Sequence, residues 1–149
     1  MRIIIFSLTK KSLIVKYLFC LFILASVCPG LNAQDDYAAI ERTVNYYLEG
    51  GTNNDFSTLK KAFHESAMMK YIGDEYTEVN ALEFFGSRMK PGPKQNRRTS
   101  IDYINISGHA ANAKLIIEYD AFSFIDYMNL LKIDGEWKIV NKIFYKKQK

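Results

Sequence analysis

Residues 124–142, FIDYMNLLKIDGEWKIVNK, carry the strongest structural signal of the sequence. Two runs rich in apolar and β-branched residues flank Asp134-Gly135, and Asp-Gly is a favoured two-residue turn of a β-hairpin. A hairpin closed by this turn places Met128 opposite Asn141. Because side chains alternate between the two faces of a strand, one face of the hairpin is mainly apolar. The stretch therefore predicts a hairpin with one buried face.

The predicted buried face carries two polar residues, Asp126 and Asn141. In this register they are diagonal neighbours across the hairpin, within reach of each other. An unpaired carboxylate there would cost on the order of several kcal/mol, so Asp126 must have hydrogen-bond partners, become protonated or lie beside a wet cavity. Two hypotheses stay open: a pocket that holds a polar ligand group between the pair, or an internal hydrogen bond that closes the core. The predicted ligand-binding residues are Asp126, Asn141, Trp137, Tyr47, Phe124 and Met128.

The other face of the hairpin mixes polar and large apolar groups. Such a mixture suits a protein interface better than a face covered by solvent. We therefore expect a homodimer through this face, which in the predicted register carries Ser123, Ile125, Tyr127, Asn129, Leu131, Val140 and Phe144.

Outward from the hairpin, the chain combines strand-like and helical patterns. Residues from Thr99 onward predict an antiparallel meander, with turns at Gly108-His109, Asp120-Ala121 and Asp134-Gly135. A change of parity between Ile101 and Ile104 predicts a bulge near Tyr103. Before the meander, apolar spacing and capping residues predict helices at 37–48, 56–63 and 80–89, with a strand at 68–72. Gly50-Gly51 is expected to end the first helix, and Asn54 or Asp55 and then Asn80 to cap the other two. The order of elements predicts the α+β class.

Residues 1–33 have the composition of a secretory signal. They hold four basic residues, no acidic residue and an apolar run from Tyr17 to Val27, with the small Ala33 at the expected cleavage site. We therefore expect the mature domain, residues 34–149, to be exported to the periplasm or secreted, and free of the membrane. The alternative is a retained membrane anchor, although the apolar run is shorter than the ~20 residues that a span needs.

Both cysteines of the chain, Cys20 and Cys28, lie in this first segment. Neither follows a small residue, which disfavours a lipoprotein. Removal of the segment leaves no thiol for disulfides, nucleophilic catalysis or metal binding. The two histidines, His64 and His109, belong to no cluster with the spacing of metal ligands, and no Gly-rich phosphate loop is present. We therefore expect neither a metal nor a cofactor.

The positive charge of the chain also comes from the first segment. The whole sequence has 20 basic and 16 acidic residues, a formal charge of +4. Without the four basic residues of the segment, residues 34–149 hold 16 of each sign. A nucleic-acid partner is not expected, because such binding needs clustered and uncompensated positive charge.

Two stretches resemble the nuclear-transport-factor-2-like (NTF2-like, or SnoaL-like) superfamily, and within it the group called putative lumazine-binding proteins. Residues 62–67, AFHESA, are similar to the Phe-His-Pro-Asp-Ala stretch of that group, with Glu65 and Ser66 departing from it. The second stretch is the hairpin of residues 124–142. The resemblance implies a cone, in which a curved antiparallel sheet wraps its concave face around N-terminal helices and leaves a cavity. It also implies dimerisation through the sheet.

The resemblance by itself does not set the activity, because the superfamily includes isomerases, cyclases, dehydratases and binding modules. Its steroid isomerases carry their base near the position of Tyr71, which cannot serve as that base. We expect an exported protein that binds an unidentified, partly apolar small molecule in the cone and catalyses no reaction. One alternative is a small lyase or isomerase with Asp126 as general base and a tyrosine hydroxyl as donor. The other is a structural module whose cavity is filled by side chains.

Overall fold

The structure is a computed structural model that describes residues 29–149. By its internal contacts the chain divides into residues 1–34 and 35–149, and the fold described below is that of the second unit. The predicted signal segment lies outside the described residues except for its last few positions. Within residues 29–149, no helix combines the length and the apolar character that crossing a membrane would require.

The helices are α2 (Pro29–Thr52), α3 (Phe56–Leu59), the 3-10 helix η1 (Lys60–Ala62) and α4 (Ala81–Arg88). Asp55 and Asn80 cap α3 and α4 with side-chain oxygens, as the sequence predicts. Helix α2 continues through Gly50 and Gly51, so the prediction that they end it is wrong. The glycine at position 50 serves packing instead, because a Cβ there would lie 2.4 Å from the backbone nitrogen of Leu59.

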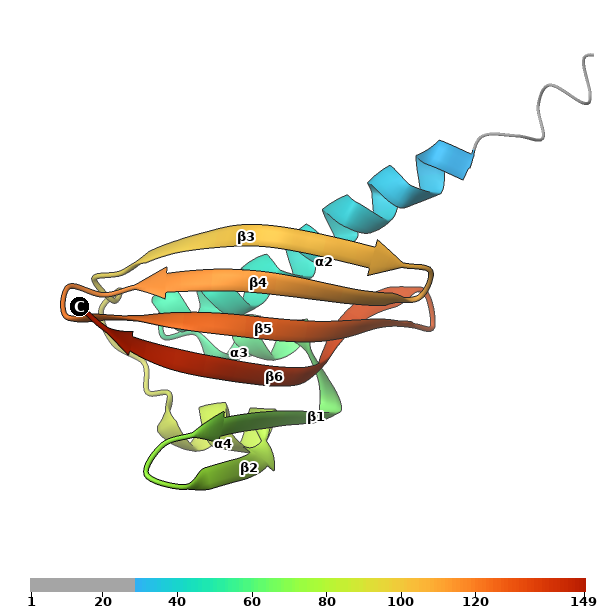
Figure 1. The fold of residues 1–149 in the computed structure, drawn as a ribbon. Coiled ribbons are helices and arrows are strands. Elements are labelled where there is room, and N and C mark those ends of the chain that lie inside the picture. Colours follow the sequence, from blue (N-terminus) through green and yellow to red (C-terminus); the bar gives the residue numbers. More distant parts are fainter. Residues whose placement is uncertain (1–28) are drawn as a thin grey trace, which may run out of the picture. The chain divides into compact units, whose positions relative to one another are not determined.

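Within residues 29–149, six strands form one sheet: β1 (Phe63–Ile72), β2 (Tyr76–Asn80), β3 (Arg98–Ser107), β4 (Ala110–Glu118), β5 (Phe122–Ile133) and β6 (Glu136–Gln148). Their order across the sheet is β2-β1-β6-β5-β4-β3, which Figure 1 shows. Strands β1 and β6 run parallel, so the sheet is mixed rather than antiparallel throughout as predicted. Strand β2, which the sequence does not predict, lies at the edge of the sheet and has no fully buried residue. A strand in such a position needs no alternation of apolar residues, and this is the pattern from which strands are predicted.

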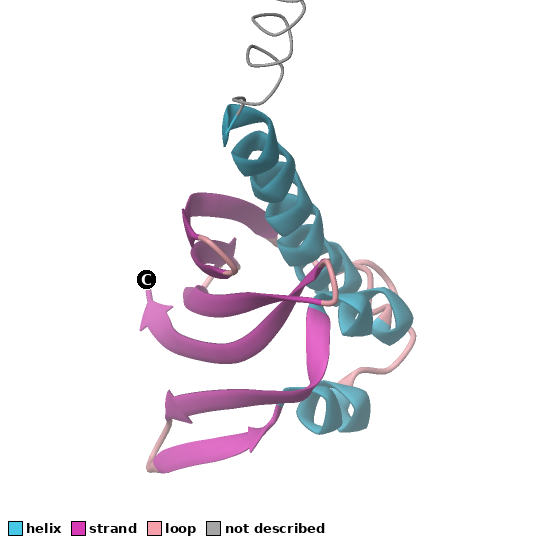
Figure 2. Ribbon diagram, turned by 90° about the vertical axis from the view of Figure 1, so that its right-hand side faces the viewer, coloured by secondary structure: helices cyan, strands magenta, loops and turns pink. Residues whose placement is uncertain are grey.

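The helices lie on one side of the curved sheet, as Figure 2 shows. Buried side chains of α2 meet buried side chains from the inner face of the strands, including Ile40, Val44, Leu48, Leu115, Met128, Leu130 and Ile139. The core therefore lies between the helices and the inner face of the sheet. This architecture confirms the predicted α+β class, with N-terminal helices packed on a curved sheet.

The register of the β5–β6 hairpin departs from the prediction at one residue. The turn forms at Asp134-Gly135, whose φ angles of 50° and 86° are those that a two-residue hairpin turn needs. The predicted pairing holds as far as Leu130 opposite Ile139. There Val140 enters as an extra residue, so Asn141 pairs with Asn129 and Lys142 pairs with Met128.

This bulge exchanges the faces of every residue that follows it in β6. Lys142 and Phe144 lie on the inner face, whereas Ile143 and Tyr145 lie on the outer face and are 46% and 64% exposed. The predicted neighbours Asp126 and Asn141 are therefore not on one face, and that pairing is wrong. The predicted outer face loses Phe144 for the same reason.

Candidate functional site

The bulge at Val140 places Lys142 of β6 beside Asp126 of β5. The Lys142 ammonium nitrogen Nζ lies 2.6 Å from Oδ1 of Asp126. Asp126 is 0% exposed and Lys142 is 3% exposed. The inner face of the hairpin thus carries a buried ion pair, in which the two residues are diagonal neighbours across the strands.

Helix α2 supplies the third member of the site, Tyr47. Its hydroxyl donates a hydrogen bond of 2.7 Å to Oδ2 of Asp126. The Tyr47 ring packs against Phe63, with centroids 5.7 Å apart, and against Phe85, at 5.8 Å. These contacts hold the hydroxyl toward the carboxylate. We refer to Tyr47, Asp126 and Lys142 as the buried triad.

Burial changes the protonation behaviour of two members of the triad. It raises the pKa of Tyr47 well above the usual range, and the Asp126 carboxylate raises it further, so the hydroxyl keeps its proton. Burial lowers the pKa of Lys142 below its ordinary value, although Asp126 acts in the opposite direction. The charged form of this lysine is therefore less favoured than that of a surface lysine.

The Lys142 ammonium has few hydrogen-bond partners for a buried cation. A lysine ammonium carries three N–H donors, and within residues 29–149 the structure gives Nζ one acceptor, Asp126. Aromatic rings occupy other sides, since Nζ lies 4.1 Å from the ring centroid of Phe144 and 5.8 Å from that of Tyr47. These rings stabilise positive charge without providing an oxygen acceptor. Nζ therefore has donor capacity for a further carbonyl or anionic oxygen.

A continuous layer of aromatic side chains adjoins the triad through Phe144. The Phe144 ring stacks on Tyr71 at 4.7 Å and meets Phe124 edge to face at 5.5 Å. Phe122 lies 5.4 Å from Phe124 and stacks on Tyr119 at 4.7 Å. All five side chains are half-buried, so the layer also meets solvent. We refer to these five residues as the aromatic wall.

Four of the six residues predicted to bind a ligand lie in or next to the triad. Tyr47 and Asp126 belong to it. Met128 pairs with Lys142 on the ladder, and Phe124 packs against Phe144. Trp137 is buried in the core, where its indole N–H donates to Oδ1 of Asp36 at 2.9 Å. Asn141 is half-buried beyond the bulge and pairs with Asn129 on the ladder. The structure thus brings neither Trp137 nor Asn141 into hydrogen-bond contact with Asp126.

Two members of the site, Lys142 and Phe144, are not predicted by the sequence, whereas Tyr71 is one of the tyrosines, with Tyr46 and Tyr47, that the sequence offers as a hydroxyl donor beside Asp126. If side chains alternate without interruption along this strand, Lys142 and Phe144 lie on the outer face. A lysine on a solvent-exposed face is common, so Lys142 gives no sign of a buried position. The residues around Val140 include no glycine or proline that would signal a bulge. At the far end of the aromatic wall, Nη1 of Arg97 donates a hydrogen bond of 2.9 Å to the hydroxyl of Tyr119.

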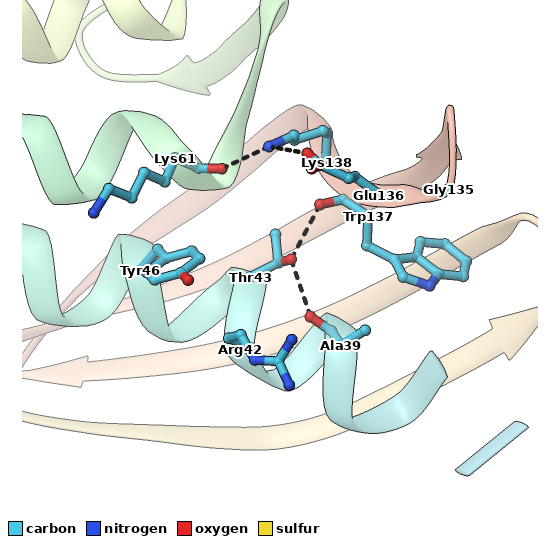
Figure 3. Close-up of a pocket in the computed structure, with 9 residues that line it drawn as sticks. All are labelled: Ala39, Arg42, Thr43, Tyr46, Lys61, Gly135, Glu136, Trp137 and Lys138. Atoms are coloured by element: carbon cyan, nitrogen blue, oxygen red, sulfur yellow. Dashed lines mark hydrogen bonds and ion pairs between the residues drawn. The ribbon is translucent and has the colours of Figure 1, made fainter. Parts of the chain in front are cut away.

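A separate pocket of about 340 Å³ lies between α2 and the β5–β6 turn, and Figure 3 shows its lining. The Thr43 hydroxyl lies 3.0 Å from the carbonyl oxygens of Ala39 and of Trp137. The Lys138 ammonium reaches Glu136 at 2.9 Å and the carbonyl oxygen of Lys61 at 3.2 Å. No member of the triad lines this pocket. Its polar groups join α2 and η1 to the hairpin.

The part of the chain that the structure describes contains no group of three or more His, Cys, Asp or Glu side chains placed to hold a metal ion. The chemistry that the site offers comes from its own groups. These are an amine, a carboxylate and a phenol in contact, beside a layer of aromatic rings.

Comparison with known proteins places the fold. The family described as "Putative lumazine-binding" matches residues 35–145. An NTF2-like protein of unknown function from Shewanella baltica OS155 is 29% identical, with a TM-score of 0.67, over 75% of this chain and 94% of that chain. Another, from Methylobacillus flagellatus KT, is 29% identical with a TM-score of 0.67, over 81% of this chain and 95% of that chain. These similarities confirm the NTF2-like fold that the sequence resemblance implies.

A curated relative of named activity also matches. It is the aldolase FrzH of a Cladobotryum species, 24% identical over 113 residues, which are 74% of this chain and 90% of the relative.

Proposed function

The chain belongs to the "Putative lumazine-binding" family of NTF2-like proteins, and we propose that it binds a small, partly apolar molecule at the inner face of its sheet, with Lys142 as the polar anchor. The observation that carries this proposal is the ammonium of Lys142, which is 3% exposed and has one oxygen acceptor within residues 29–149. A buried cation with spare donors is stabilised by a ligand oxygen that completes its hydrogen bonds.

The surroundings of Lys142 define the class of ligand. The aromatic wall favours a flat, apolar or aromatic body, because such a body packs face to face or edge to face on aromatic side chains. The ammonium favours a carbonyl or anionic oxygen on that body. Lumazine, in the family's name, is a flat heterocycle with carbonyl groups and is therefore a suitable probe.

Fluorescence titration with lumazine and with 8-anilinonaphthalene-1-sulfonate tests the proposal. The probes are titrated into the wild type, Lys142→Met and Lys142→Met/Asp126→Leu, the last of which leaves no unpaired buried charge. Loss of Lys142 should weaken binding by about 10–100-fold, since a hydrogen bond to a charged group contributes about 1.5–3 kcal/mol. The control Lys147→Met removes an exposed lysine of the same strand and should bind as the wild type does. Equal affinities of the wild type and the double variant would refute the proposal.

An aldol-type reaction is the second candidate function. The Cladobotryum relative is an aldolase by name, and the triad supplies a carboxylate, Asp126, in contact with two donors. Asp126 would remove a proton beside a carbonyl group while Lys142 or Tyr47 stabilises the enolate oxygen. The test is exchange of the α-protons of cyclohexanone in D₂O, followed by NMR. Exchange should be faster with the wild type than with Asp126→Asn, and equal rates would exclude this role.

Export and a homodimer belong to the same proposal. Export is supported by the composition of residues 1–33. The homodimer is supported by the outer face of the sheet, where Ile143 and Tyr145 are exposed beside Tyr127 in an apolar groove of about 310 Å³.

A further inference from the structure

We infer that Lys142 is a nucleophile, which forms an imine with an aldehyde or ketone group of the bound molecule. This inference rests on the inner-face binding site proposed above. In the second candidate function Asp126 only removes a proton. Here Nζ of Lys142 forms a covalent bond to the carbonyl carbon of the ligand.

The contacts of Nζ supply what imine formation needs. An amine must lose a proton before it attacks a carbonyl carbon, and Oδ1 of Asp126 lies 2.6 Å from Nζ. The second carboxylate oxygen accepts the hydroxyl hydrogen of Tyr47 at 2.7 Å. One carboxylate therefore touches both the amine and a phenol, so a proton can pass between Nζ, Asp126 and the oxygen of a bound carbonyl group.

The environment of Nζ favours the neutral amine more than water does. Lys142 is buried on the inner face of β6, and its nitrogen lies 4.1 Å from the centroid of the Phe144 ring. Burial lowers the pKa of Lys142, which increases the fraction of reactive amine at a given pH. Phe144 is itself half-buried, so the ring beside Nζ is in partial contact with solvent.

The reaction balances with the groups present. Asp126 takes one proton from the ammonium, and the nitrogen lone pair forms a bond to the carbonyl carbon while the C=O π pair moves to oxygen. Asp126 returns its proton to that oxygen, takes a second proton from nitrogen, and delivers it to the resulting hydroxyl as water leaves and the C=N bond forms. In sum, an ammonium and a carbonyl compound become an iminium ion and water, with no oxidant or reductant.

The product suits the site as well as the starting ammonium does. An iminium ion carries one positive charge at the position where the ammonium carried it, so the ion pair with Asp126 is retained. Its flat C=N group continues into the ligand body, which contacts the aromatic wall at Phe144, the ring nearest to Nζ. The substrate class is therefore an aldehyde or ketone attached to a flat, apolar body.

Reductive trapping of the full-length protein with benzaldehyde and sodium cyanoborohydride tests the inference. The reductant converts an imine to a stable secondary amine, which peptide mapping by mass spectrometry assigns to a lysine. Lys142 should be modified at least about tenfold faster than exposed Lys147, although Lys142 is the more buried of the two. The matched control is the same protein in urea, in which this preference should disappear.

The outcomes separate this inference from the binding site on which it rests. Selective modification of Lys142, slowed by 8-anilinonaphthalene-1-sulfonate, supports both. Selective modification that the sulfonate does not slow supports the nucleophile and contradicts the proposed binding site. Modification of surface lysines with Lys142 left intact, in a protein that binds the sulfonate through Lys142, overturns the nucleophile and leaves the binding site standing. If neither modification nor binding involves Lys142, the ion pair is structural and both are wrong.

Discussion

Separate and combined removal of the two charges should reveal strong coupling between Asp126 and Lys142. Lys142→Met leaves a 0%-exposed carboxylate with Tyr47 as its hydrogen-bond donor. Breaking a buried ion pair in this way should lower the free energy of unfolding by about 3–5 kcal/mol. Asp126→Leu leaves a buried ammonium and should cost a similar amount, with about 1–3 kcal/mol more from the unpaired Tyr47 hydroxyl.

The double variant Lys142→Met/Asp126→Leu contains neither charge. Its loss should be limited to about 1–3 kcal/mol, because the unpaired Tyr47 hydroxyl is what remains of the cost. The double variant should therefore be more stable than either single variant, with a coupling energy of about 3 kcal/mol or more. Urea unfolding measures all four proteins, with fluorescence of Trp137, the one tryptophan of the chain, as the probe. Losses that add to within about 0.5 kcal/mol would refute the ion pair as an energetic unit.

Gly50→Ala should lower the free energy of unfolding by about 1–3 kcal/mol in thermal unfolding, because the added Cβ would meet Leu59. The control Gly73→Ala should change it little, because its Cβ would have its nearest neighbour at 3.7 Å. Similar losses of stability in the two variants would contradict the close packing of Gly50 against Leu59. The Thr58 hydroxyl lowers the pKa of Asp55 from 3.8 to about 2, so this residue stabilises the fold above pH 3.8 and loses that effect as the pH falls through about 2. Asp55→Asn should flatten the change of stability between these pH values. The same dependence of stability on pH in the variant and the wild type would contradict this role of Asp55. Ile143→Lys should convert a dimer to a monomer in light scattering, and a monomeric wild type would show the homodimer to be wrong. N-terminal sequencing of the exported product should begin at or near Gln34, and an intact leader on a membrane-bound protein would contradict export.

Much of the fold could be predicted because the local signals were strong and mutually consistent. The Asp134-Gly135 turn fixes the hairpin, and Asp55 and Asn80 mark helix starts by their capping oxygens. A bulge near Tyr103 is also readable, because apolar residues change parity around it, and the ladder shifts there. The parallel pairing of β1 with β6 joins segments far apart in sequence, and no local pattern encodes it.

The candidate site depends on the feature that the sequence did not reveal. Asp126 could be singled out because an acid on an apolar face needs a partner. Its partner could not, because Val140 fits a strand as well as it fits a bulge, and the extra residue turns Lys142 inward. Tertiary pairing with β5 and β1 therefore decides which polar side chain meets the carboxylate.

A crystal structure of the protein grown with 8-anilinonaphthalene-1-sulfonate tests whether Lys142 anchors a ligand, because it locates the bound molecule. We expect the sulfonate within hydrogen-bond distance of Nζ of Lys142, with the aromatic rings of the probe against Phe144 and the aromatic wall. A probe bound instead in the groove beside Ile143 and Tyr145, which Tyr71 and Phe144 also line, without contact to Nζ and with the Lys142–Asp126 pair unchanged, would contradict the inner-face binding site.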